Sequence, residues 1–144
     1  MYIWTAGSAV SVFKNTRMRQ NDSSRITLHA ARGMEVSAQI LLREYADFDI
    51  TDVTVAGLPD DVRAEIRYQD YITYNDGIPY PDILSRTAPH VKAQTTQGVW
   101  VTFFVGENAV PGARPIQCTV RTSAGDFTAA VVLTVYPAVL PTPA

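Results

Sequence analysis

The sequence has a single cysteine, Cys118, and therefore cannot form an internal disulfide. Its two histidines, His29 and His90, are far apart, and together with one cysteine they show none of the spacing of a metal site. The glycines are scattered singly, so no glycine-rich loop is present to hold a phosphate. These absences predict a chain without a metal or a cofactor. Cys118 alternates with apolar neighbours, which predicts a buried, unreactive thiol rather than a nucleophile.

Basic residues are not in excess, because 12 lysines and arginines stand against 14 aspartates and glutamates and the net charge is −2. This balance argues against nucleic acid or an anionic membrane surface as a partner. No apolar run approaches the roughly 20 residues that span a bilayer. Residues 1–5 lack the charged and apolar regions of a signal peptide, which favours the cytoplasm if Met1 is the native start.

What the sequence does contain is a strong two-residue periodicity. Residues 34–42 alternate between apolar and mostly polar side chains, as in an antiparallel strand with one buried face. Residues 99–105 alternate too, but their second face carries Trp100, Thr102 and Phe104 and is too apolar to lie open to water. Residues 116–121 and 127–136 flank a short turn at 123–126, which predicts a β-hairpin. Weaker strand patterns cover residues 2–5, 8–12, 25–30, 50–56 and 64–74.

About eight or nine strands at this spacing, with no helical stripe, predict an all-β fold, an antiparallel, immunoglobulin-like β-sandwich. We expect one domain over residues 1–136. Three prolines in the last eight residues, 137–144, predict a stiff linker toward a catalytic domain further along the same polypeptide.

Residues 75–97 show little strand pattern. They include Pro79, Pro81 and Pro89, which cannot donate a backbone hydrogen bond to a neighbouring strand. A loop of this length in a compact domain is typically functional or covers another surface.

An ordered set of short sequences runs through nearly the whole chain. They are Ile3-Trp4-Thr5, Val12-Phe13, residues 28–40, Tyr80-Pro81-Asp82-Ile83-Leu84, residues 98–105, Ala109-Val110-Pro111-Gly112 and Leu133-Thr134-Val135-Tyr136. In this order they resemble the N-terminal β-sandwich domain of glycoside hydrolase family 123, the β-N-acetylgalactosaminidases. The sequence departs from the family pattern at Arg114-Pro115-Ile116, where a tyrosine and a glycine usually follow.

The resemblance implies a domain that is not itself an enzyme, because in that family a pair of adjacent acidic residues acts in a separate, downstream barrel. The adjacent carboxylates of this chain, Asp60 and Asp61, lie at a predicted turn between strands. An acid/base pair needs two carboxylates that converge on one bond at a defined separation, and a turn does not provide this.

A group of aromatic residues has a binding interpretation: Tyr68, Tyr71, Tyr74, Tyr80 and Trp100. Exposed rings would stack on sugars, whereas buried rings would pack between sheets or against a neighbouring domain. The tyrosines at 68 and 74 share one strand face and the tyrosine at 71 takes the other, so the group cannot line one flat surface. This favours packing or an interdomain role.

Three hypotheses follow from the sequence. In the first, the chain is an accessory module that orients a glycosidase barrel, with Tyr80, Pro81, Asp82, Trp100 and Phe104 at the interface. In the second, it is a carbohydrate-binding module that holds a glycan with the Tyr80 loop and Trp100. In the third, it is a stand-alone immunoglobulin-like domain for adhesion or scaffolding.

Overall fold

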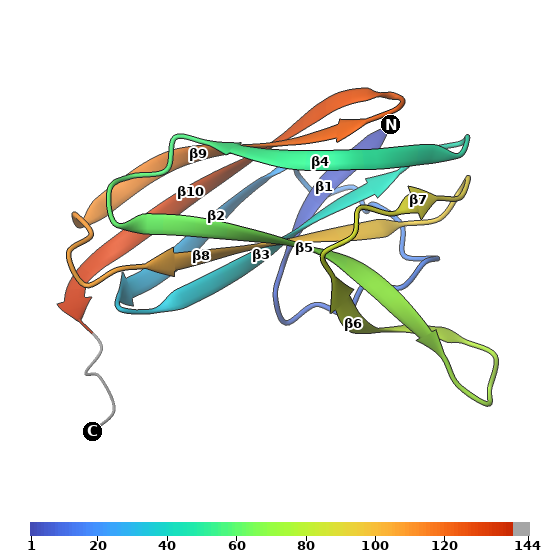
Figure 1. The fold of residues 1–144 in the computed structure, drawn as a ribbon, viewed down its shortest axis with the longest axis horizontal. Helices are drawn as coiled ribbons and strands as arrows, with labels where there is room; N and C mark the ends of the chain where they lie inside the picture. Colours follow the sequence, from blue (N-terminus) through green and yellow to red (C-terminus); the bar gives the residue numbers. More distant parts are fainter. Residues whose placement is uncertain (140–144) are drawn as a thin grey trace.

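Two β-sheets lie face to face in the computed structural model, which describes residues 1–139 (Figure 1). The strands of this range are β1 (Tyr2–Gly7), β2 (Arg25–Arg32), β3 (Glu35–Arg43), β4 (Phe48–Ala56), β5 (Val62–Thr73), β6 (Pro79–Ser85), β7 (His90–Val91), β8 (Gln97–Val105), β9 (Gly112–Thr122) and β10 (Gly125–Val139). The first sheet has the order β1-β3-β8-β5-β6 and the second the order β2-β10-β9-β4-β7. The predicted all-β sandwich is therefore confirmed.

The core lies between the sheets, where the sequence periodicity placed it. β3 and β8 contribute Ala38, Ile40, Leu42, Val99, Val101 and Phe103, all fully buried. From the opposite sheet, β9 and β10 contribute Ile116, Cys118, Val120, Ala129, Val131, Leu133 and Val135. Full burial of a large aliphatic or aromatic side chain stabilises the fold by about 1.5–3 kcal/mol.

The hairpin predicted near the C-terminus is confirmed. β9 and β10 pair in register from Thr122 and Gly125 back to Gly112 and Val135. Gly125 has a φ of 123°, a conformation that residues with a Cβ avoid and that lets the chain reverse over two residues.

Two features of the predicted sandwich need correction. The described residues form ten strands rather than eight or nine. One pair is parallel, because β10 runs alongside β2 in the same direction while its other neighbour, β9, is antiparallel. A two-residue period predicts which side of a strand is buried but carries no information about the direction of its neighbour.

Residues 8–12 were expected to form a strand, and this prediction is wrong. They belong to the long β1–β2 connection, which crosses the outer face of the first sheet. Val12 is 2% exposed there and packs against Trp4 and Leu41. The side-chain nitrogen of Gln39 donates to the carbonyl oxygens of Gly7 at 2.9 Å and Val10 at 2.6 Å. A small second core therefore holds this segment on the sheet.

Residues 75–97 were expected to have little strand character, and this is also wrong, because β6 and β7 lie within them. β6 is an edge strand of the first sheet, with a register irregularity between the Asp70–Ile83 and Ile72–Tyr80 pairs. Pro81 lies at that irregularity. An edge strand tolerates proline because one side of its backbone has no partner strand to satisfy.

The last strand extends into the segment predicted to be a linker. β10 continues through Pro137 to Val139, so residues 137–139 belong to the sandwich. Pro137 lies at the register shift between Tyr136 and Val139, where its missing N–H breaks no ladder bond. The rest of the predicted linker, residues 140–144, lies outside the described residues.

Candidate functional site

The interface residues suggested by the sequence fall in two places rather than one. Tyr80 lies on β6 opposite Ile72, whereas Trp100 lies on β8 opposite Arg67. Their partners are five positions apart on β5, which corresponds to about 17 Å along an extended strand. The structure therefore does not bring Tyr80 and Trp100 together on one sugar-binding platform.

Trp100 and Phe104 are half-buried on the outer face of the first sheet. The indole N–H of Trp100 donates to the side-chain oxygen of Gln69 at 3.0 Å. The guanidinium carbon of Arg63 lies 4.0 Å from the centre of the Phe104 ring, a cation–π contact. Side chains of β5 thus cover part of this face, in agreement with the expectation that it does not lie open to water.

Tyr80 is half-buried in an aromatic cluster at the far end of the β5–β6 hairpin. Its ring centre lies 5.4 Å from that of Tyr74 and 5.8 Å from that of Phe13, both edge to face. The Tyr80 hydroxyl donates to the Asp76 carboxylate at 2.7 Å, and the Tyr74 hydroxyl donates to the Asp82 carboxylate at 2.6 Å. Two tyrosine–aspartate pairs therefore fix the shape of the hairpin.

These hydrogen bonds also shift the pKa values of Tyr74, Asp76 and Tyr80. The bond from Tyr80 lowers the pKa of Asp76, and the same bond raises the pKa of Tyr80. The bond to Asp82 raises the pKa of Tyr74. Both phenols are therefore harder to deprotonate than an ordinary tyrosine.

The hairpin exposes a set of large apolar side chains, which we call the hairpin surface: Ile72, Tyr74, Ile78, Ile83 and Leu84. Each of them is between 39% and 51% exposed. Figure 1 shows the β5–β6 hairpin reaching beyond the body of the sandwich. The charged residues of its outer part are all acidic, since residues 69–85 contain three aspartates and no lysine or arginine.

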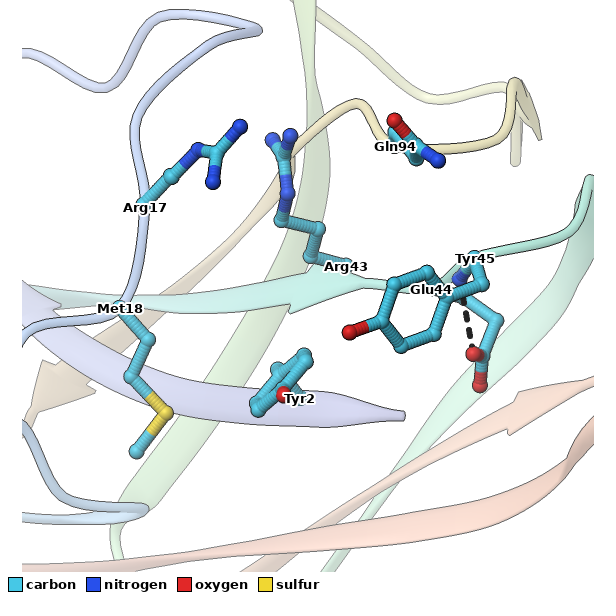
Figure 2. A pocket seen from close by; sticks show the side chains of 7 residues that line it. All are labelled: Tyr2, Arg17, Met18, Arg43, Glu44, Tyr45 and Gln94. Carbon is cyan, nitrogen blue, oxygen red and sulfur yellow. Dashed lines mark hydrogen bonds between the residues drawn. The ribbon is translucent and has the colours of Figure 1, made fainter.

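A pocket of about 290 Å³ lies at the other edge of the first sheet, beside β1 (Figure 2). It is lined by Tyr2, Arg17, Met18, Arg43, Glu44, Tyr45 and Gln94. These residues come from β1, the β1–β2 connection, the end of β3 with the two residues that follow it, and the segment between β7 and β8. Sequence reasoning missed them because no spacing links four segments that only the fold brings together.

The other aromatic candidates have structural roles. Tyr68 is buried in the core at 6% exposure. The Tyr71 hydroxyl donates to the carbonyl of Thr96 at 3.0 Å, the Lys14 ammonium lies 5.0 Å from the ring centre, and burial raises the pKa of Tyr71 to about 12.

Asp60 and Asp61 form a turn, as predicted. Asp61 has a φ of 58°, and its carboxylate accepts a hydrogen bond from the backbone N–H of Asn108 at 2.8 Å. Within residues 1–139, no three His, Cys, Asp or Glu side chains are grouped so that they could hold a metal ion. The same range contains no helix long and apolar enough to cross a membrane.

Comparisons with known proteins show similarity of fold and none of sequence. No protein-family model matches the chain, and no curated protein matches its sequence. A solved structure of a family 123 glycoside hydrolase from Clostridium perfringens, studied for glycolipid glycan hydrolysis, superposes with a TM-score of 0.75 at 11% identity. The secreted serine protease VesC from Vibrio cholerae matches with a TM-score of 0.47 at 11% identity, over 76% of this chain and 21% of that one.

The match to the Clostridium perfringens hydrolase covers 97% of this chain and 28% of the hydrolase. This chain therefore shares its fold with one part, about a quarter, of that larger protein. At 11% identity the likeness establishes the fold alone.

Proposed function

We propose that this chain is a non-catalytic accessory module of a glycoside hydrolase and that it packs against a catalytic domain of the same polypeptide. The observation that carries the proposal is the structural match, which spans 97% of the chain but 28% of a family 123 glycoside hydrolase. The order of short sequences described above points to the same family independently of the coordinates.

The hairpin surface is the proposed contact with the catalytic domain. Its five large apolar side chains are roughly half exposed and come from one projecting hairpin. Exposed large apolar side chains that are concentrated on one hairpin make it a candidate interaction site. Tyr80, Pro81 and Asp82 lie on the same hairpin, so three of the five residues suggested by the sequence belong to the proposed interface.

The form of β6 favours contact through side chains over pairing with an added strand. Pro79 and Pro81 lack the N–H groups that an added strand would need. The aspartates of the hairpin give its surroundings a negative charge, which favours a partner surface that is apolar at its centre and basic at its rim.

Trp100 and Phe104 are the weaker candidates for this contact. Gln69 already binds the Trp100 indole, and Arg63 already covers the Phe104 ring. We therefore propose that both side chains mainly stabilise the module and lie no nearer to the interface than its rim.

The proposal is tested first by the gene that encodes this chain. We expect its reading frame to continue beyond codon 144 into a catalytic barrel with two adjacent acidic residues. A stop codon directly after codon 144 would remove the proposal of a shared polypeptide and would favour the stand-alone adhesion or scaffolding module.

A further inference from the structure

Two arginine side chains, Arg17 and Arg43, line the pocket beside β1. Figure 2 shows the guanidinium groups of Arg17 and Arg43 on one side of the pocket, while the Glu44 carboxylate points away from them. That carboxylate lies 2.8 Å from the α-amino group of Met1 and accepts a hydrogen bond from the Tyr45 N–H at 2.8 Å. No carboxylate of residues 1–139 forms an ion pair with either guanidinium. Both cations line one pocket, so an anion bound in it would be stabilised by both.

Arg43 is held in position for such a contact. One of its terminal nitrogens donates to the Lys14 carbonyl at 3.2 Å and to the Thr96 hydroxyl at 3.1 Å. Arg43 is also the last residue of β3, where it pairs with Tyr2. Since a guanidinium has five N–H donors in a fixed plane, the donors that remain can bind the two oxygens of a carboxylate or sulfate.

The opposite wall of the pocket is aromatic. The rings of Tyr2 and Tyr45 have centres 6.5 Å apart and planes inclined at 62°, so they form a corner rather than a slot for a flat ligand. These side chains are 49% and 71% exposed. The electron-rich faces of such rings attract polarised C–H groups. Figure 2 shows the Met18 side chain closing the third side.

Gln94 completes the rim with a polar side chain. Its φ of 57° lies in the left-handed region, which is unusual for a residue with a Cβ. Its backbone N–H donates to the carbonyl of Glu44 at 2.8 Å, which fixes the loop beside the pocket. Strained positions of this kind cluster at functional sites. The Gln94 amide can both donate to and accept from a hydroxyl group.

We propose that this pocket binds one acidic sugar residue, a pyranose that carries a carboxylate or a sulfate group. The volume of about 290 Å³ matches a ligand of one ring, because sites for drug-sized molecules begin at about 300 Å³. The arginine pair holds the anionic group, the tyrosine corner receives the C–H face of the ring, and Gln94 binds a hydroxyl. The site is independent of the proposed docking, since β1 and β6 are opposite edges of the first sheet.

The test uses the 144-residue chain and four probes: glucuronate, galactose 6-sulfate, glucose and inorganic sulfate. Binding is followed by backbone amide NMR and by calorimetry. We expect at least one acidic sugar to shift the amide resonances of Glu44, Tyr45 and Gln94. Of glucuronate and galactose 6-sulfate, the sugar that binds more tightly identifies the preferred anionic group. Arg17→Gln should weaken this binding about tenfold or more, because it removes charged hydrogen bonds. Tyr45→Ala should weaken it too, and Arg19→Gln, in the same segment but outside the pocket, should not.

Three results would overturn the proposal. They are binding of glucose as tight as that of the acidic sugars, binding of inorganic sulfate as tight as that of galactose 6-sulfate, and unchanged affinity in Arg17→Gln. Arg17 is exposed, so its replacement leaves the fold intact and a negative result is interpretable. None of these measurements involves a catalytic domain, so failure of the docking proposal would not affect them.

Discussion

The imidazole of His90 is bound to Asp49, with 2.7 Å between Nδ1 of the histidine and Oδ1 of the aspartate. Its other nitrogen, Nε2, lies 3.2 Å from the carboxylate of Asp47. The short strand β7 is thereby fastened to β4 by a histidine between two carboxylates. The hydrogen bond to Asp49, followed by that to Asp47, raises the pKa of His90. The N–H of Ala93, followed by His90, lowers the pKa of Asp47.

These two shifts predict a pH window for the β4–β7 contact. Because the pKa of His90 is raised in the folded state, its contribution is complete below about pH 6.5 and is lost as the pH rises through the raised value. The lowered pKa of Asp47 gives a contribution that is present above about pH 4 and lost as the pH falls further. We expect His90→Gln to lower the melting temperature more at pH 5.5 than at pH 8.5, with Asp49→Asn behaving alike. A loss of melting temperature in His90→Gln that is equal at both pH values, or larger at pH 8.5, would contradict this account.

Replacement of Gly57 is predicted to destabilise the fold, because its backbone conformation and a close neighbour leave no room for a Cβ. Its φ is 88°, and a Cβ at this position would lie 2.8 Å from the carbonyl oxygen of Pro115. Gly57→Ala should therefore destabilise the protein by roughly 1–3 kcal/mol in chemical denaturation. Gly7→Ala is the matched control, because a Cβ there meets no heavy atom within 4 Å. A similar loss in both variants would show that the clash is relieved at little cost.

Cys118 is predicted to react slowly in the native protein. It is 0% exposed, and burial raises the pKa of its thiol to about 11. Since the thiolate is the reactive form, iodoacetamide should modify the folded chain slowly at pH 8 and the urea-unfolded chain quickly. Mass spectrometry at fixed times measures both rates. Equal rates would place Cys118 at the surface and shift the register of β9 by one residue.

The period of alternation explains why the core could be predicted and the edges could not. β3, β8, β9 and β10 carry apolar side chains at alternate positions on the face toward the other sheet, so their inward residues are visible in the sequence. β6 is a partly exposed edge strand with a register irregularity, and residues 79–85 therefore show no alternation. For the same reason Ile83 and Leu84 were recognised only as part of a family resemblance.

The candidate site could be predicted only in part. Tyr80 was expected to serve an interface, but its contacts with Phe13, Tyr74 and Asp76 show that it also stabilises the hairpin itself. We therefore expect Tyr80→Ala to lower the stability of the isolated chain as well. The pocket beside β1 was not predictable, because Arg17 and Arg43 line it together only when the β1–β2 connection lies on the sheet.

The chain by itself is predicted to lack hydrolytic activity. Asp60 and Asp61 lie in a turn. The Asp61 carboxylate accepts a hydrogen bond from the Asn108 N–H and does not converge with the Asp60 carboxylate on one substrate position. The purified 144-residue chain should therefore release no phenol from aryl β-N-acetylgalactosaminides above the rate of the buffer. Turnover that persists through purification and disappears in Asp60→Ala would contradict the account.

Docking through the hairpin surface is the central claim, and a pair of threonine substitutions tests it. Ile83→Thr with Leu84→Thr removes apolar contact area and keeps the edge strand, and Val110→Thr is the control because Val110 is 57% exposed elsewhere. Anchors of an interface typically cost about 2 kcal/mol or more when truncated. Melting curves are measured for the isolated chain and for the full polypeptide that contains the catalytic domain. We predict almost no change in the isolated chain and a clear loss of stability in the full polypeptide. Equal losses in both, or no loss in either, would contradict docking through this surface.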